Sequence, residues 1–164
     1  MYIYGYHILL IALWAAAALT TAFALWKGDA AVKYGALTHL AVEVLTFVVN
    51  PRFGDVGAES ILLALDFGCS VVYLLLAVRF ANLWLGAAML LQAAVFSLHA
   101  YYLVMELPHD RLHAWINNTC DWGIMISICV GTVLAIRRRA AMAREAAELE
   151  ALRQQRATRM QVAH

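Results

Sequence analysis

The fold is decided by residues 61–78, which read ILLALDFGCSVVYLLLAV and carry one charged side chain, Asp66. An α-helix of about 20 apolar residues crosses the hydrocarbon layer of a membrane, which is about 30 Å thick. That layer holds no water, so a crossing segment must satisfy its own backbone hydrogen bonds, as a helix does. The stretch therefore predicts a transmembrane helix.

Four other stretches predict the same kind of helix: residues 3–26, 34–49, 83–105 and 119–136. The stretch 34–49 is the shortest and the most polar, because it holds Thr38, His39, Glu43 and Thr46. We expect an all-α, polytopic transmembrane helix bundle of five spans. The alternative is four spans, with residues 34–49 re-entrant or lying against the membrane surface.

The composition excludes several classes of protein. Of the 164 residues, 64% are hydrophobic and 14% are charged, whereas soluble domains carry about 25% charged residues. The net charge of +1 leaves no basic face for a phosphate backbone, so we expect no nucleic-acid partner. The chain has no P-loop, dinucleotide-binding or nucleophile-elbow motif, and we expect it not to be an enzyme.

The basic residues favour one orientation in the membrane, because short cytoplasmic loops hold the excess of Lys and Arg. With five spans and a cytoplasmic carboxy terminus, all 12 basic residues except Arg52 and Arg111 lie on the cytoplasmic side. Four spans would move the amino terminus inside, where no basic residue holds it. We therefore predict an integral, multi-pass protein with its amino terminus outside.

The carboxy-terminal segment 137–164 differs in character from the bundle of residues 1–136. It reads RRRAAMAREAAELEALRQQRATRMQVAH and has no glycine or proline to break a helix. We expect a cytoplasmic amphipathic helix that continues the last span. Arg137, Arg138 and Arg139 would anchor it at anionic lipid headgroups, and a short coiled coil with a second copy is the alternative.

Ionisable side chains inside the spans are the candidate functional residues, because a charge in hydrocarbon costs several kcal/mol unless it is paired or faces water. At a rise of about 1.5 Å per residue, Glu43, Asp66 and His99 lie about 8 to 9 Å below the outer boundary. Ser70 and Tyr73 follow Asp66 at i+4 and i+7 and extend one polar face. That face must look into protein or water.

His39 lies one turn from Glu43 on the same helix face, so we expect the two side chains to hydrogen-bond. Together with Asp66 and His99 they predict a polar vestibule in the outer half of the bundle and a path for protons or cations. Toward the inner half the path is incomplete within one subunit, since the only polar side chains there are those of Thr20, Thr21, Gln92 and Ser127.

Metal and haem sites are alternatives for the same residue types. Histidine and carboxylate side chains inside the spans are ligands for Zn, Fe or Mn, and His7 with His99 would hold a haem between two helices. Outside the spans, His109 and His113 have i, i+4 spacing beside Asp110 and form a candidate external metal or pH-sensing site. We expect no cofactor, and leave the metal open.

Gly123, Ser127 and Gly131 place small residues at every fourth position of the last span, a pattern typical of close helix contacts within one subunit or between copies. The leading expectation for function is a small oligomeric pore or an ion- or proton-conducting subunit, with the lipid bilayer and further copies, or a larger membrane complex, as partners. A non-catalytic accessory or scaffold subunit is the second expectation. A haem- or metal-binding membrane module is the third.

Overall fold

A computed structural model describes the backbone of residues 2–49, 54–108 and 110–162 and the side chains of 11–49, 59–108, 110–156 and 158. The described chain forms five α-helices and no strand. They are α1 (Tyr2–Lys27), α2 (Ala30–Val49), α3 (Gly54–Phe80), α4 (Leu83–Val104) and α5 (Arg111–Val162). The expectation of an all-α chain is confirmed.

Aspartate side chains cap two of the helices that begin earlier than the apolar pattern indicates. Asp29 accepts a hydrogen bond from the backbone N–H of Val32 through Oδ1 at 3.0 Å, and α2 therefore starts at Ala30 rather than at residue 34. Asp110 accepts one from the backbone N–H of His113 at 2.9 Å, and α5 starts eight residues before the expected boundary. An N-cap satisfies a backbone donor that the first helical turn leaves free.

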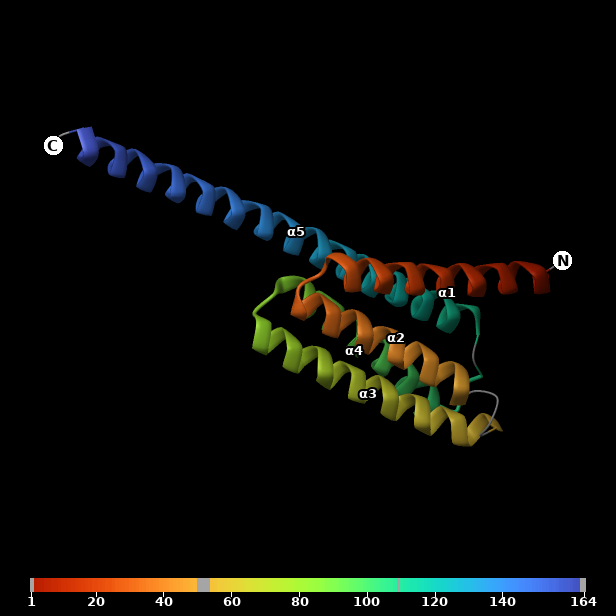
Figure 1. Ribbon diagram of the computed structural model, residues 1–164. Helices are drawn as coiled ribbons and strands as arrows, with labels where there is room; N and C mark the ends of the chain where they lie inside the picture. Colours follow the sequence, from red (N-terminus) through yellow and green to blue (C-terminus); the bar gives the residue numbers. More distant parts are fainter. Residues whose placement is uncertain (1, 50–53, 109, 163–164) are drawn as a thin grey trace.

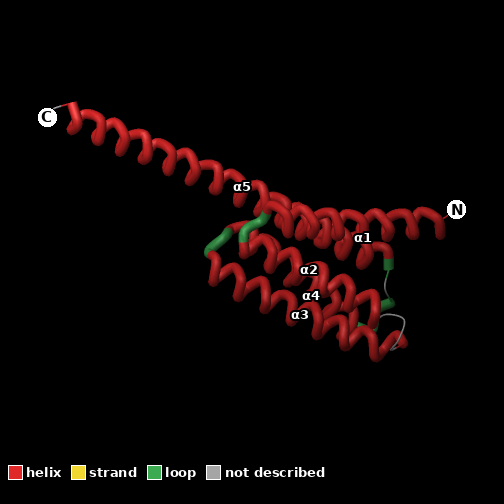
Figure 2. Tube along the Cα trace, viewed as in Figure 1, coloured by secondary structure: helices red, strands yellow, loops and turns green. Residues whose placement is uncertain are grey.

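The helices pack side by side along one common direction (Figures 1 and 2). α1 and α5 lie together on one side of the bundle, and α2, α3 and α4 form the rest. We use "loop end" for the end that carries the α4–α5 connection at 105–110. "Tail end" is the opposite end, with the tight α1–α2 and α3–α4 turns, beyond which α5 projects as a single unbroken helix.

Four to five of the helices are long and apolar enough to cross a membrane. Four reach that length within the described residues: Ala30–Val49, Glu59–Phe80, Leu83–Val104 and Arg111–Arg156. The described side chains of α1 add a shorter apolar stretch, Ile11–Lys27. These helices are compatible with integral membrane localisation. Residues 34–49, the shortest of the five expected spans, belong to a helix of 20 residues.

The core lies toward the tail end and is built mainly from α2, α3, α4 and α5, with Ala24 of α1. Val32, Tyr73, Leu85, Ile124 and Ile128 are fully buried in it. Because the core is close-packed, any side chain added there must displace its neighbours.

The small residues of α5 face α4 within the same chain. A Cβ at Gly123 would come within 2.8 Å of Leu91, and one at Gly131 within 2.5 Å of the Trp84 ring. Between them, Ser127 donates its hydroxyl to the backbone carbonyl of Gly123 at 2.9 Å. Of the two roles that the pattern predicts, close packing within a subunit is therefore the one that Gly123 and Gly131 perform.

Candidate functional site

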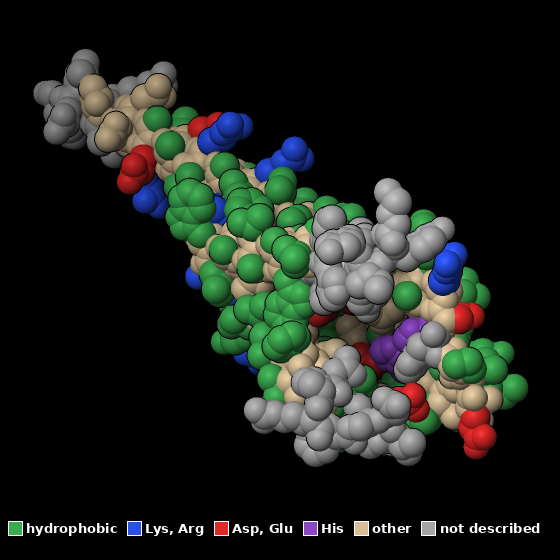
Figure 3. Space-filling view, turned by 90° about the vertical axis from the view of Figure 1, so that its right-hand side faces the viewer, with side chains coloured by type: hydrophobic (Ala, Val, Ile, Leu, Met, Phe, Trp, Pro, Cys, Tyr) green, Lys and Arg blue, Asp and Glu red, His purple; other side chains and the backbone are tan. Residues whose placement is uncertain are grey.

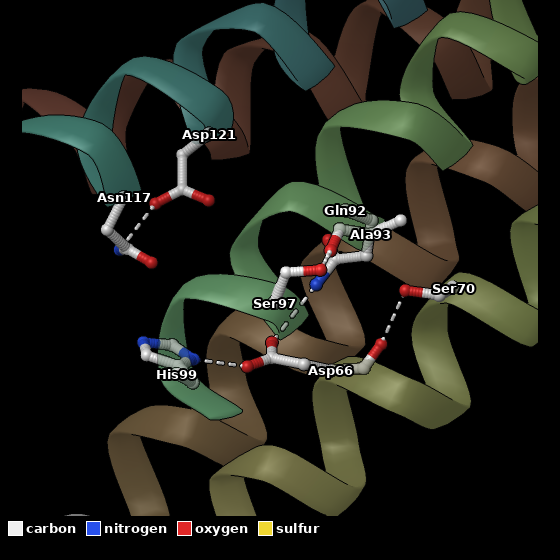
Figure 4. A network of polar contacts seen from close by, with 8 residues as sticks. All are labelled: Asp66, Ser70, Gln92, Ala93, Ser97, His99, Asn117 and Asp121. Carbon is white, nitrogen blue, oxygen red and sulfur yellow. Dashed lines mark hydrogen bonds and ion pairs between the residues drawn. The ribbon is translucent and has the colours of Figure 1, made fainter. Parts of the chain in front are cut away.

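Asp66 of α3 is the centre of a buried polar contact between α3 and α4 (Figure 4). Its Oδ1 accepts a hydrogen bond from Nε2 of Gln92 at 3.0 Å. Its Oδ2 is bonded to Nδ1 of His99. The Ser70 hydroxyl donates to the backbone carbonyl of Asp66 at 2.9 Å and does not touch the carboxylate. Both carboxylate oxygens are thus held by side chains of α4.

The polar contact continues from His99 to the loop end. The rings of His99 and His113 lie 4.9 Å apart between centroids, at an angle of 33°. The His113 ring also meets the edge of Tyr102, at 4.7 Å, and the Tyr102 hydroxyl donates to Oδ1 of Asp110 at 2.8 Å. We call the series Gln92, Asp66, His99, His113, Tyr102 and Asp110 the Asp66 network.

The network reaches solvent at its loop end. Asp110 is exposed, and a cavity of about 30 Å³ opens beside His99, lined also by Glu59, Leu62 and Leu103. A cavity of that size has room for a water molecule next to polar groups. In the space-filling view, histidine and acidic side chains gather at this end, whereas most of the visible basic side chains lie toward the other (Figure 3).

Two further carboxyl groups face the same part of the bundle. Glu43 of α2 interacts electrostatically with Asp66, and Asp121 of α5 interacts with both Glu43 and Asp66. Asp121 is only 9% exposed and points toward the region where α3 and α4 meet (Figure 4). Its Oδ2 accepts a hydrogen bond from Nδ2 of Asn117 at 3.2 Å. Four helices therefore contribute acidic or imidazole groups to one layer of the bundle.

His39 departs from its expected arrangement. Its side chain is 3% exposed, yet its Nε2 makes no hydrogen bond with any residue that the structure describes. The expected bond from this nitrogen to Glu43 is therefore not formed. A buried imidazole nitrogen without a partner is costly.

Tyr73 closes the polar layer on the tail-end side. Its fully buried hydroxyl donates to the backbone carbonyl of Gly35 in α2 at 3.0 Å. Beyond it the bundle is filled by the apolar core that contains Val32, Trp84, Leu85 and Ile128. The expected gap in the polar path of a single subunit therefore coincides with this packed core.

Asp110 is the one network carboxyl that lies outside the candidate spans. Hydrogen bonds from the His113 backbone N–H and from the Tyr102 hydroxyl lower the pKa of Asp110 below its ordinary value of 3.8. Both donors favour the charged carboxylate over the neutral acid. The group at the entrance of the network is therefore an anion at neutral pH.

The metal and haem alternatives receive no support from the described residues. No three His, Cys, Asp or Glu side chains among them converge closely enough to hold a metal ion. His109 lies outside the described residues, as does the side chain of His7, so the external His109–His113 site and the His7–His99 haem stay expectations. Asp110 and His113 are instead joined by a helix cap.

The three basic residues at the start of the tail do different things. Arg138 donates to Oδ1 of Asn82 in the α3–α4 turn at 2.7 Å. Arg139 donates to the backbone carbonyls of Lys27 at 3.2 Å and of Gly28 at 2.7 Å. Arg137 is exposed and makes no such bond with the described residues. Two of the three expected lipid anchors thus hold the tail end of the bundle together.

Three residues of this site escaped the sequence analysis: Gln92, Tyr102 and Asp121. The sequence places Gln92 in the inner half, because its depth depends on where α4 crosses the other helices. Tyr102 resembles a membrane-interface aromatic until its hydroxyl is seen on Asp110. Comparison of the chain with protein-family models, with curated proteins and with solved structures finds no match.

Proposed function

We propose that the protein is a proton-conducting subunit of a membrane, with Asp66 as its central proton-binding group. The observation that carries the proposal is the Asp66 carboxylate held between Gln92 and His99 on a network that leads to exposed Asp110. Ionisable groups inside apolar spans mark ion and proton pathways by default, because they are too costly to keep otherwise.

Several features favour protons over hydrated ions. Gln92 and His99 each bond directly to Asp66, and the cavity beside His99 has a volume of only about 30 Å³. A hydrated cation needs more space than that, whereas a proton needs a series of groups that accept and donate it. Between the neighbouring rings of His99 and His113, one bridging water or a ring rotation passes the proton onward.

The proposal includes an orientation and an assembly. With the loop end facing away from the cytoplasm, the basic residues of the tail lie inside, in agreement with the usual charge bias. Because Tyr73 and the apolar core close the other half of the chain, the second half of the path is supplied by association with further copies.

Proton flux into liposomes tests the proposal. We expect Asp66→Asn to abolish the pH change that an imposed potential drives in vesicles loaded with a pH-sensitive dye. The matched control is Glu145→Gln, the same type of change on the exposed tail, which should leave flux intact. Circular dichroism and gel filtration show whether Asp66→Asn folds. Folded Asp66→Asn with unchanged flux would refute the proposal.

An accessory subunit of a larger membrane complex is the second candidate. The part of α5 beyond the bundle exposes Met142, Leu149 and Leu152 on a charged helix, a surface suited to a protein neighbour. Co-purification with another membrane protein in fixed stoichiometry, together with absence of flux from the isolated chain, would favour this candidate. A homogeneous oligomer that conducts protons by itself would exclude it.

A further inference from the structure

A groove runs along the outer surface of the bundle between α1 and α5, with a volume of about 430 Å³. Its walls are apolar apart from the Thr20 hydroxyl, the Cys129 thiol and the guanidinium of Arg137. Ile126, Val130 and Val133 line it and are 42 to 59% exposed, so they face the surroundings of the bundle. In a membrane those surroundings are acyl chains.

The basic groups gather at one end of this groove. The Cys129 thiol lies 3.9 Å from the Thr20 hydroxyl, which fixes the level of α1 against α5. Eight residues further along α5 comes Arg137, and seven residues further along α1 comes Lys27. Both steps are about two helical turns on the same face. The bond from Arg139 to the Lys27 carbonyl shows directly that the two helices reach the same level there.

The guanidinium of Arg137 is available for a ligand, whereas those of Arg138 and Arg139 are already bonded within the bundle. Arg138 is bonded to Asn82, and Arg139 to the carbonyls that end α1. The Lys27 ammonium lies 4.1 Å from the Trp26 ring centroid. It is a compact, strongly hydrated charge at the tail end of the bundle. Arg137 therefore lines the end of the apolar groove, and the register of α1 places Lys27 at about the same level.

The groove extends along α5 from Arg137 to Trp122, about 22 Å at about 1.5 Å per residue, and is therefore long enough for one lipid chain. From Arg137 to Ile126 the α5 backbone rises about 16 Å, at about 1.5 Å per residue. One leaflet contributes about half of a 30 Å hydrocarbon layer, or about 15 Å. A chain that hangs from a headgroup at Arg137 thus ends near the level of Ile126, within the groove.

We propose that this groove binds one anionic phospholipid, with the phosphate between Arg137 and Lys27 and an acyl chain along α5. The charge at one end and the apolar walls, which are at least as long as one leaflet is thick, match the two parts of such a molecule. The bound lipid completes the packing between α1 and α5 at the tail end. The site is separate from the Asp66 network and does not depend on proton conduction.

Native mass spectrometry of the full chain, purified in detergent and stripped of lipid, tests the site. We expect phosphatidylglycerol to bind one per chain and more tightly than phosphatidylcholine of the same acyl chains. Arg137→Gln and Lys27→Gln should each weaken binding about fivefold, as expected for one basic residue at an anionic lipid surface. Arg144→Gln, a matched loss of charge on the exposed tail, should have no effect. Glycerol phosphate, which has the headgroup chemistry without a chain, should not compete.

Val130→Trp fills the groove while both cations remain and should also weaken binding of phosphatidylglycerol; circular dichroism checks its fold. Equal binding of the two lipids, or equal effects of Arg137→Gln and Arg144→Gln, would overturn the proposal. If Val130→Trp instead lowers the number of subunits and leaves lipid binding unchanged, a second copy of the chain occupies the groove and the proposal is also wrong.

Discussion

Gly131 of α5 lies against the indole of Trp84 in α4 so closely that a Cβ at position 131 would come within 2.5 Å of the ring. The absence of a side chain at Gly131 lets the indole approach the α5 backbone at the tail end of the bundle. This is the kind of approach that small residues allow in membrane helices.

We expect Gly131→Ala to lower the free energy of unfolding by about 1 to 3 kcal/mol, the usual cost of overpacking a close-packed core. Gly68→Ala is the control, since a Cβ there meets nothing within 4 Å. That change should be neutral or stabilising, by up to about 1 kcal/mol, because alanine favours helix over glycine. Thermal unfolding in detergent, followed by circular dichroism, compares the two, and equal effects would contradict the packing.

A second prediction concerns the bond between Asp66 and Gln92. Asp66→Leu leaves the Gln92 amide, which is 3% exposed, without its acceptor. An unsatisfied buried donor costs about 1 to 3 kcal/mol. The double variant Asp66→Leu with Gln92→Leu removes donor and acceptor together and should be more stable than Asp66→Leu alone. A double variant whose loss equals the sum of the single losses would show that the two side chains are not coupled.

An Ala→Gly substitution should have opposite effects on stability in the α3–α4 turn and on the exposed side of α4. Ala81 has φ = 48°, a left-handed conformation that is unfavourable for a residue with a Cβ. Ala81→Gly should therefore stabilise the protein by about 0.5 to 1 kcal/mol, after the higher entropy of the unfolded chain is allowed for. Ala87→Gly, on the exposed side of α4, should destabilise it by about 1 kcal/mol. If both substitutions shifted the unfolding midpoint in the same direction, the result would contradict the left-handed conformation of Ala81.

Asp110 gives a prediction about pH. Its pKa is lowered in the folded protein by the His113 backbone N–H and the Tyr102 hydroxyl. A carboxyl group of this kind contributes stability that is fully present above its unfolded pKa and is lost as the pH falls through the lower, folded value. The contribution should therefore decline below pH 3.8. Asp110→Asn keeps a capping side chain that does not titrate.

The test compares the unfolding midpoints of the native protein and of Asp110→Asn between pH 6 and pH 2.5, roughly the range over which a carboxyl of lowered pKa titrates. The comparison separates the contribution of Asp110 from those of the other carboxyl groups. The native protein should lose stability relative to the variant only in the acidic part of this range. A constant difference between the two would show that Asp110 has its ordinary pKa in the folded state.

The last prediction separates the roles of two neighbouring arginines. Arg139→Ala removes the donors to the Lys27 and Gly28 carbonyls and should lower the free energy of unfolding by about 1 kcal/mol, a value reduced by the exposure of these bonds. Arg137→Ala should leave stability in lipid-free detergent unchanged, since Arg137 makes no bond to the described chain. Equal losses of unfolding free energy in the two variants would contradict the different contacts of Arg137 and Arg139.

Much of the fold could be predicted because it follows from local properties of the chain. Residues 61–78 have few ways to satisfy their backbone in an apolar layer other than a helix, and α3 contains them all. The boundaries were less predictable. The start of α5 was placed eight residues late, since the cap at Asp110 is set by one side chain rather than by hydropathy. Asp121 therefore lies ten residues after the first residue of α5, rather than two.

The sequence by itself determined that Asp66 must look into protein or water, because a short carboxylate side chain in the middle of an apolar helix cannot reach the surface. Only the tertiary structure decided its partners, Gln92 and His99, since the rotation and level of α4 against α3 follow from the packing of whole helix faces. The same reason explains why Gly123 and Gly131 of α5 pack against α4. It also explains why Arg139 bonds to the end of α1 whereas Arg137 does not. The sequence gives the chemical type of each side chain, whereas the packing of the helices determines which side chains are in contact.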